Sequence, residues 1–281
     1  DGTKYRIYAR AQDRAQNYQT PISSLTFSYD ITGATSTVTY PYTLYHSSVV
    51  TISGTAYDAT AGVQQTRIKI RRDAAYWTGT SWGSLKWLLV NGTTQWTYPV
   101  PGEWVEWASG REYEITPWAI DYTGNESTGT IKTFRYDNTL PDSQITPLPV
   151  HTKYYRSLPT ISGTARDPIP GGGTSASGVS ETKLSFYSHS ENKYYNVITE
   201  HFDLSSEEYQ PLSGQATSWY LTGYETVLID GSSYTVKSKS WDSSQPKMEE
   251  TVYTDGVNRV FFIYDTSKPT ATIISPDPNK P

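Results

Sequence analysis

The chain has 281 residues, of which 36% are hydrophobic, 14% aromatic and 18% charged, and its formal net charge is −5. This composition indicates folded material for about two domains of ordinary size, and the negative charge excludes a broad attraction to nucleic acid. No apolar run approaches the roughly 18 residues of a membrane helix, and cysteine is absent, so we expect no membrane insertion in this segment, no disulfides and no thiolate chemistry.

The predicted elements begin with two strands in residues 1–33, each marked by a motif that recurs later. The first motif is a tyrosine followed eight residues later by aspartate, and the second is Phe-x-Tyr-Asp. A third motif, TISGTA, precedes both in the later copies. The motif copies begin, in chain order, at Tyr5, Phe27, Thr51, Tyr113, Phe134, Thr160, Tyr234 and Phe262. Repetition in a constant order predicts tandem copies of one structural unit.

The interval between copies is close to the roughly 100 residues of one β-sandwich domain. We therefore predict the C-terminal strands of a preceding domain at 1–33, complete domains at 34–140 and 141–268, and the first strand of a following domain at 269–281. A loop insertion at 168–176, rich in Pro and Gly, lengthens the second complete domain. We therefore expect the chain to be a segment of a longer array of such domains.

Strict alternation of apolar and polar residues identifies the strands and their buried faces. Tyr113, Ile115 and Ala119 share one face, and the aligned positions of the other copies keep similar sizes, so this face is predicted to line the core. Ile52, Gly54 and Ala56 form a second such face, and Ile68 with Ile70 a third. No amphipathic helical stretch is present. The pattern predicts an all-β, antiparallel fold with about seven strands per domain.

The tyrosine at the head of each penultimate strand is typical of the tyrosine corner of immunoglobulin-like sandwiches, in which the hydroxyl bonds nearby backbone. With the segments SGTAYD, WAIDYTGNES and FRYDNTLPDSQIT, the chain resembles the bacterial immunoglobulin-like repeats of very large surface proteins and adhesins. The resemblance covers the whole chain. It implies tandem immunoglobulin-like (Greek-key) β-sandwich domains in a linear array, extracellular or at the surface of a bacterial cell.

Catalytic chemistry is not indicated by any motif. The four histidines, His46, His151, His189 and His201, stand in neither a metalloprotease HExxH pattern nor a GxSxG nucleophile elbow. We interpret them as exposed loop or strand residues, and we expect that this segment is not an enzyme.

Aspartates follow the strands at positions that sandwich topology brings to one end of a domain. Asp30, Asp58 and Asp121 are predicted to converge at the first junction, and Asp137, Asp167 and Asp242 at the next. Carboxylates packed together repel, and hard oxygen ligands suit Ca²⁺, so the sequence predicts calcium at the interdomain junctions. The alternative is that each aspartate only closes an Asx-type turn.

The tryptophans are concentrated, because six of the nine fall between Trp77 and Trp107. Exposed rings such as Trp77 and Trp82 would form a glycan contact, whereas buried rings would fill the core of the sandwich. Trp118 is the exception, since alternation directs it outward. It is predicted either to contact a neighbouring domain or chain, or a glycan, or to be an incidental surface ring. Asn91 and Asn125 begin sequons in predicted turns and are candidates for glycosylation.

The leading functional hypothesis is a structural segment of a long extracellular rod, stalk or fibre. Its partners would be neighbouring immunoglobulin-like domains of the same longer chain and other copies in a fibre. One alternative is a carbohydrate-binding module that uses the aromatic cluster of 34–140, with glycans as partners. Another is a spacer of a secreted polysaccharide-degrading enzyme.

Overall fold

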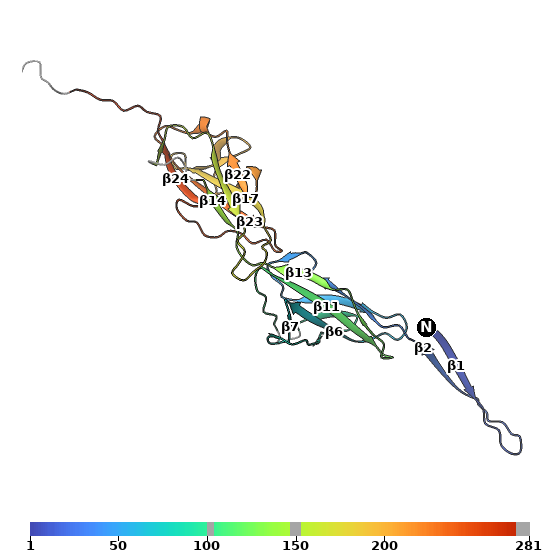
Figure 1. Cartoon of the computed structure of the whole chain (residues 1–281). Helices are drawn as coiled ribbons and strands as arrows, with labels where there is room; N and C mark the ends of the chain where they lie inside the picture. The colour runs from blue at the N-terminus through green and yellow to red at the C-terminus, as the bar shows by residue number, and fades with distance from the viewer. Residues whose placement is uncertain (100–103, 147–152, 274–281) are drawn as a thin grey trace, which may run out of the picture. The chain divides into compact units, whose positions relative to one another are not determined.

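The computed structural model describes residues 1–99, 104–146 and 153–273, and it is built of strands (Figure 1). The one helical element among these residues is a short 3-10 turn, η1 (Glu225–Val227). No helix in the part of the chain that the structure describes is long and apolar enough to span a membrane. The predicted all-β fold class is confirmed.

The chain divides into two compact units. Unit 1 consists of Asp1–Asn138 and Pro170–Ser175, and unit 2 consists of Thr139–Ile169 and Ala176–Pro281. The division near residue 138 falls close to the predicted boundary between the two complete domains.

Two predicted segments differ from expectation. Most of the insertion at 168–176 belongs to unit 1, because the N–H of Thr174 donates to the carbonyl of Gly110 at 2.8 Å. A Cβ added to Gly110 would also stand 2.9 Å from the Cα of Gly173, so glycine permits this close approach. The strand predicted at 269–281 is not formed at residues 269–273, and its remainder lies outside the described residues.

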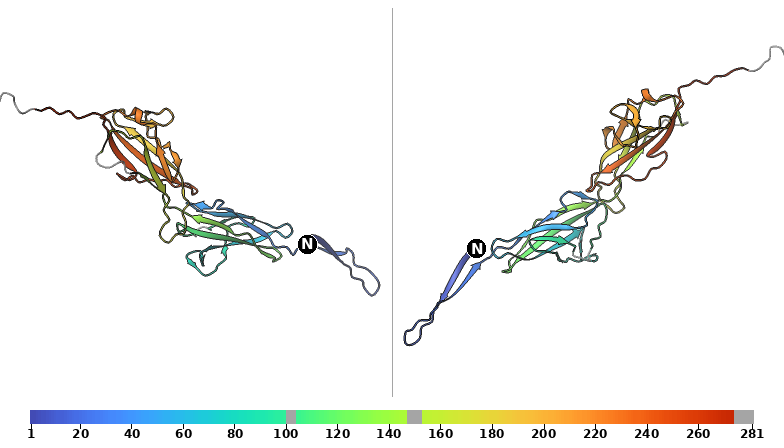
Figure 2. Two further views of the ribbon diagram at one scale, coloured as in Figure 1. Left: turned by 45° about the horizontal axis from the view of Figure 1, so that its top comes forward. Right: turned by 180° about the vertical axis from the view of Figure 1, so that it is seen from behind.

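Unit 1 is a two-sheet sandwich with an N-terminal hairpin. Its strands are β1 (Thr3–Ala9), β2 (Ser23–Tyr29), β3 (Thr35–Tyr40), β4 (Tyr45–His46), β5 (Ile52–Tyr57), β6 (Val63–Arg72), β7 (Ala75–Trp77), β8 (Trp82–Gly83), β9 (Leu88–Leu89), β10 (Gln95–Tyr98), β11 (Arg111–Asp121), β12 (Glu126–Thr128) and β13 (Lys132–Tyr136). One sheet has the order β10-β5-β3, and the other β4-β13-β11-β6-β7-β8, with β12 beside β11 and β9 beside β6. The hairpin β1–β2 is a two-stranded ribbon (Figure 2).

Unit 2 repeats this plan. Its strands are β14 (Asp142–Ile145), β15 (Tyr154–Tyr155), β16 (Ile161–Arg166), β17 (Val179–Ser188), β18 (Lys193–Asn196), β19 (His201–Leu204), β20 (Gln210–Pro211), β21 (Ser213–Gln215), β22 (Ser218–Leu221), β23 (Ser233–Asp242) and β24 (Arg259–Tyr264). The sheets have the orders β14-β16-β22-β21 and β15-β24-β23-β17-β18-β19, with β20 beside β17.

Strand order identifies the sandwich type. In each unit the TISGTA strand, β5 or β16, pairs with the first strand of the sandwich, β3 or β14, and with a much later strand, β10 or β22. The next long strand, β6 or β17, belongs to the opposite sheet and pairs with the long strand that carries the motif tyrosine, β11 or β23. This is the Greek-key order of immunoglobulin-like domains.

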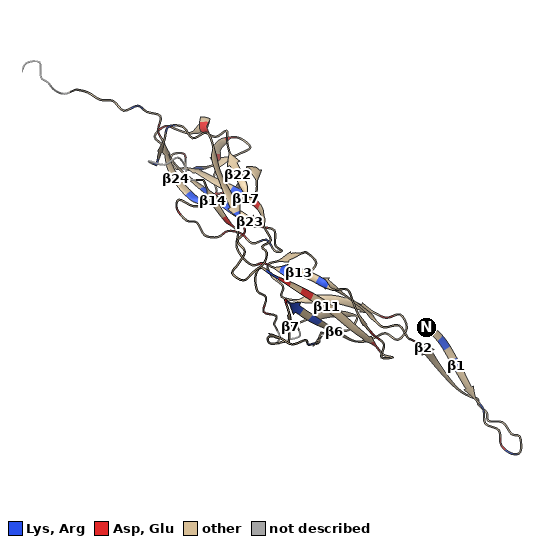
Figure 3. Cartoon of the chain, in the orientation of Figure 1, with Lys and Arg blue, Asp and Glu red and all other residues tan. Residues whose placement is uncertain are grey.

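Alternation along the long strands sorts core from surface as predicted. Ile68, Ile70, Tyr113 and Ile115 are completely buried. The residues between the two isoleucines of β6 and on either side of them are cationic, and the cationic residues of β6 are blue in Figure 3.

The repeated TISGTA sequence has a packing cause at its glycine. Gly54 pairs with Trp96 across β5 and β10, and Gly163 pairs with Trp219 across β16 and β22. A Cβ on Gly54 would stand 2.1 Å from the Cζ2 atom of the Trp96 indole, and one on Gly163 would stand 2.2 Å from the same atom of Trp219. Only glycine leaves room for the ring, and both tryptophans are buried.

The other two motifs pair with each other. In every copy the motif tyrosine lies opposite the motif phenylalanine on an adjacent antiparallel strand, and the two rings stack. The centroid distances and interplanar angles are 5.5 Å and 23° for Tyr5–Phe27, 5.4 Å and 23° for Tyr113–Phe134, and 5.3 Å and 24° for Tyr234–Phe262. The second and third pairs are fully buried, whereas Tyr5 and Phe27 are 47% and 42% exposed.

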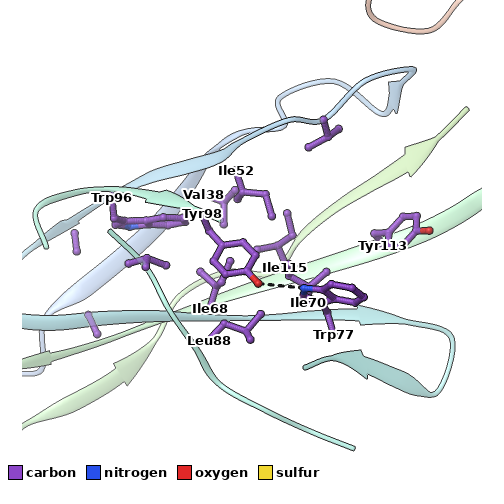
Figure 4. Close-up of a cluster of buried hydrophobic side chains, with 14 of the residues drawn as sticks. Val38, Ile52, Ile68, Ile70, Trp77, Leu88, Trp96, Tyr98, Tyr113 and Ile115 are labelled. Atoms are coloured by element: carbon purple, nitrogen blue, oxygen red, sulfur yellow. Dashed lines mark hydrogen bonds between the residues drawn. The ribbon is translucent and has the colours of Figure 1, made fainter. Parts of the chain in front are cut away.

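Both complete tyrosine corners are formed. The backbone N–H of Ala108 donates to the hydroxyl of Tyr113 at 2.6 Å, and that of Ile229 donates to Tyr234 at 2.7 Å. The unit 1 core also holds a hydrogen bond between two aromatic side chains, because the indole N–H of Trp77 donates to the hydroxyl of Tyr98 at 3.1 Å (Figure 4). The buried polar atoms of Trp77, Tyr98, Tyr113 and Tyr234 thus have hydrogen-bond partners. Nε1 of Trp96, Nε1 of Trp219 and the hydroxyl of Tyr224 are buried without a partner among the described residues.

Strand β14 forms one edge of its sheet, and its outward N–H groups are occupied. The N–H of Ser143 donates to Oε1 of Glu250 at 3.1 Å, and the N–H of Ile145 donates to the carbonyl of Val257 at 2.8 Å. Glu250 is 5% exposed, and its carboxylate also accepts from the Ser143 hydroxyl, the Ser240 N–H and the Asn258 amide. A side-chain carboxylate therefore takes the place of a neighbouring strand.

Candidate metal centre

Three aspartates of unit 1 meet where strands end. Asp30 follows β2, Asp58 follows β5, and Asp121 is the last residue of β11. One carboxylate oxygen of each lies within 4.8 Å of the others. Two ligands of a single Ca²⁺ ion, each about 2.4 Å from it, can be no farther apart than about this separation. The first predicted cluster is therefore brought together.

Asp58 holds its oxygen through a turn. Its Oδ1 accepts hydrogen bonds from the backbone N–H groups of Thr60, Ala61 and Gly62, at 3.0, 2.7 and 2.8 Å. These three donors fix the carboxylate before any ion binds. The expected Asx-type turn is present, and it is compatible with ligation through the other oxygen.

Asp121 is fully buried and more extensively bonded. Its Oδ1 accepts from the N–H groups of Thr123 and Asn125, at 2.8 and 2.9 Å, and its Oδ2 accepts from the Asn125 side-chain amide at 2.9 Å. Burial alone would raise the pKa of Asp121, but the hydrogen bonds from Asn125 and Thr123 outweigh it and lower the pKa. The carboxylate is held in its charged form.

Asp30 supplies the oxygen that lacks a hydrogen-bond partner among the residues the structure describes. Its side chain is 8% exposed, and its Oδ1 accepts from the N–H of Thr32 at 3.1 Å. Its buried Oδ2 accepts no hydrogen bond from the described residues. Burying a carboxylate oxygen without a donor is costly, and a cation at the cluster would remove that cost.

Asn125 links the two sides of the cluster and was not predicted to belong to it. Its side-chain amide donates to the backbone carbonyl of Asp30 at 3.2 Å as well as to Asp121. Asn125 follows Asp121 by four residues, as Asn17 follows Asp13. The backbone N–H and the side-chain amide of Asn17 donate to the Asp13 carboxylate in the same way, at 2.8 and 2.9 Å. This shared Asp-x-x-x-Asn spacing is the sequence signal that could have identified the residue.

The second predicted set is divided between the two units. Asp137 belongs to unit 1, where its Oδ1 accepts from the hydroxyl of Ser109 at 3.1 Å. Asp167 and Asp242 belong to unit 2, and each closes a turn: Asp167 accepts from the N–H of Gly178, and Asp242 from the N–H groups of Ser244 and Met248. Convergence of this set stays a prediction.

The three tryptophans predicted as contact residues differ in their burial. Trp77 is 1% exposed in the core, so the glycan contact suggested for it is wrong, because its ring faces other buried side chains. Trp82 is half-buried, packs against the same core and donates its N–H to the carbonyl of Glu106 at 3.2 Å. Trp118 is half-buried on the outer face of β11 and donates to Oε2 of Glu126 at 3.3 Å.

The two sequons also differ. Asn91 is exposed. The amide nitrogen of Asn125 donates to Asp30, Asp121 and Thr123, so an N-linked glycan would break the contacts that order the aspartate cluster. Glycosylation at Asn125 is therefore inconsistent with this geometry.

The histidines are not all exposed. His189 and His201 are exposed as predicted, and His151 lies outside the described residues. His46 is completely buried, which the sequence interpretation missed. Its Nε2 contacts the hydroxyl of Thr43 at 2.9 Å, and its Nδ1 contacts the hydroxyl of Tyr40 at 3.4 Å. Burial lowers the pKa of His46 below its ordinary value.

No family model and no curated protein matches the chain. Among solved structures, fibronectin(III)-like modules of Clostridium thermocellum CbhA align over 85% of this chain and 99% of theirs, with 8% identity and a TM-score of 0.32. A titin fragment aligns over 86% and 78%, with 13% identity and a TM-score of 0.38. A 1.5-MDa bacterial ice-binding adhesin aligns over 95% and 76%, with 11% identity and a TM-score of 0.33. It is the strand order of the two units that identifies the chain as tandem immunoglobulin-like β-sandwich domains.

Proposed function

We propose that this chain is a structural segment of a long extracellular rod or stalk of the bacterial surface-protein or adhesin type, whose domains are joined through Ca²⁺ sites. The observation that carries the proposal is the cluster of Asp30, Asp58 and Asp121, in which the buried Oδ2 of Asp30 has no hydrogen-bond partner among the described residues. Calcium takes 6–8 oxygen ligands in flexible geometry, so three carboxylates with backbone carbonyls or water suit it.

The position of the cluster explains what calcium would do. Asp30 ends the hairpin β1–β2, whereas Asp58 and Asp121 belong to the sandwich that follows. An ion bound to all three would fix the chain at residues 31–33 and limit bending there. A rod needs stiff connections of this kind, because short linkers otherwise allow domains to move.

The hairpin supports the proposal that residues 1–33 are the last strands of another immunoglobulin-like domain. Tyr5 and Phe27 stack with the geometry of the two buried pairs, and Ile7 and Leu25 extend the same apolar surface. In unit 1 the corresponding surface is covered by the rest of the sandwich. An isolated two-stranded hairpin is marginally stable at best in water, so we expect further strands to cover this apolar face.

Calorimetric titration of the 281-residue chain with CaCl₂ tests the function. We expect two sites per chain with dissociation constants below about 1 mM, and Asp30→Asn should remove one of them or weaken it at least tenfold. Asparagine keeps the Oδ1 acceptor of the turn and removes the charge. Asp255→Asn is the matched control, because Asp255 is exposed and pairs with Arg259.

Small-angle scattering supplies the mechanical readout. Calcium should increase the maximum dimension relative to chelator, and Asp30→Asn should reduce that increase. No heat of calcium binding, together with an unchanged maximum dimension, would leave the aspartates as turn formers and contradict the proposal.

A further inference from the structure

The outer face of unit 1 carries a groove that the rod function does not explain. It has a volume of about 510 Å³, and its lining includes Gln65, Arg67, Trp87, Trp118 and Glu126. Small-molecule sites in proteins occupy about 300–1,000 Å³. The residues come from β6, β11, β12 and the segment before β9, all within one unit.

Two indole rings form the apolar part of the groove. Trp87 and Trp118 are half-buried, and their ring centroids lie 6.2 Å apart with an interplanar angle of 43°. The hydrogen bond from Trp118 Nε1 to Glu126 fixes the orientation of that ring. An indole has a flat apolar face and a polar edge, which suits a partner that carries both apolar and polar surface, such as a sugar ring.

Two cations, Arg67 and Lys69, lie beside these rings without a carboxylate partner among the described residues. The guanidinium of Arg67 lies 5.3 Å from the Trp118 ring centroid, and its Nε donates to Oε1 of Gln65 at 2.8 Å. The Lys69 ammonium lies 5.1 Å from the Trp87 ring centroid. Neither cation forms an ion pair within the described ranges 1–99, 104–146 and 153–273.

Unit 2 provides an internal comparison. On its equivalent face Trp241 also donates its indole N–H to a carboxylate, that of Glu249, at 3.0 Å. The lysines of that face are all neutralised, in the pairs Lys183–Glu181, Lys237–Glu207 and Lys239–Glu249 at 3.0, 2.9 and 3.0 Å. The sandwich therefore does not require unpaired cations on this face, and unit 1 retains them beside its two indoles.

We infer that this groove binds an acidic saccharide, with Trp87 and Trp118 against the pyranose rings and Arg67 and Lys69 against a sugar carboxylate. A guanidinium binds carboxylates through paired N–H donors, and the neighbouring indoles strengthen the contact by removing water. An acidic peptide would satisfy the cations but would offer no flat ring to the indoles. The inference does not depend on the calcium sites or on the rod function.

The test uses the full chain in EDTA, because uronic acids themselves bind calcium. A tetrasaccharide of glucuronic acid is titrated while binding is followed by calorimetry and tryptophan fluorescence. We expect saturable binding below about 10 mM, and at least tenfold weaker binding of the neutral analogue cellotetraose. Trp118→Ala and Arg67→Gln should each weaken glucuronate binding at least tenfold.

Trp241→Ala is the matched control and should bind as the unchanged chain does. Thermal melting checks that each variant folds. If Trp118→Ala does not fold, Arg67→Gln alone tests the inference, because it leaves both indole rings in place. Absence of saturable binding, equal binding of cellotetraose, tighter binding of a tetraglutamate peptide, or an equal loss in Trp241→Ala would overturn the inference.

Discussion

The indole of Trp96 lies directly against Gly54, its partner on the neighbouring strand, so closely that a Cβ on Gly54 would stand 2.1 Å from Cζ2 and 2.2 Å from the carbonyl oxygen of Thr37. Neither the ring nor the backbone can move far, because Trp96 is 1% exposed. Gly54→Ala should therefore destabilise unit 1 by about 1–3 kcal/mol through overpacking, measured by urea unfolding. Gly83→Ala is the control, since its nearest neighbour would be 3.7 Å away.

The hydroxyl of Tyr113 can be tested without disturbing its ring. Tyr113→Phe removes the acceptor of the Ala108 N–H and leaves the stack on Phe134 intact. We expect a loss of about 1 kcal/mol in the free energy of unfolding, the usual contribution of one hydrogen bond. Tyr122→Phe should change nothing measurable, because Tyr122 is 69% exposed. Equal effects of the two substitutions would argue against the corner.

Substitution of Glu250, even by glutamine, should destabilise unit 2. Glu250→Gln places an NH₂ group among donors, since the carboxylate accepts from Ser143, Ser240 and Asn258. Donors facing donors in a buried site cost about 1–3 kcal/mol, which chemical denaturation would detect as a lower midpoint. Glu208→Gln, at an exposed position, should leave the midpoint unchanged.

His46 should make unit 1 less stable in mild acid. Because burial lowers its pKa, the unfolded chain binds more protons than the folded chain once the pH falls below about 6.5. The free energy of unfolding should therefore fall between pH 7.5 and pH 5.5. His46→Gln should flatten that dependence, whereas His189→Gln, at an exposed site, should preserve it. An unchanged pH profile in His46→Gln would contradict the role assigned to the buried ring.

Local patterns were sufficient to predict most of the sandwich. Tyr113, Ile115 and Ile52 are buried as alternation required, because one face of a strand must enter the core. The first aspartate cluster was also predictable, since Greek-key order alone brings Asp30, Asp58 and Asp121 to one end.

Features that depend on contacts between distant segments were not predicted. Glu250 lies 107 residues from Ser143, and no local pattern distinguishes it from its exposed neighbour Glu249. The buried serines of β23, Ser238 and Ser240, were the available signal, because polar residues on a core face require a polar partner. The insertion likewise joins unit 1 through Gly110, a contact that loop composition cannot indicate.

Blocking of the β14 edge by Glu250 also bears on misfolding. Tandem domains of the same fold are tethered at effective concentrations of millimolar order, so an open strand edge in one can capture a strand of the next. Here the two outward N–H groups of β14, at Ser143 and Ile145, are already occupied. A strand from another domain would have to displace a buried carboxylate to pair there. The same glutamate thus protects this domain against strand exchange and edge-to-edge aggregation.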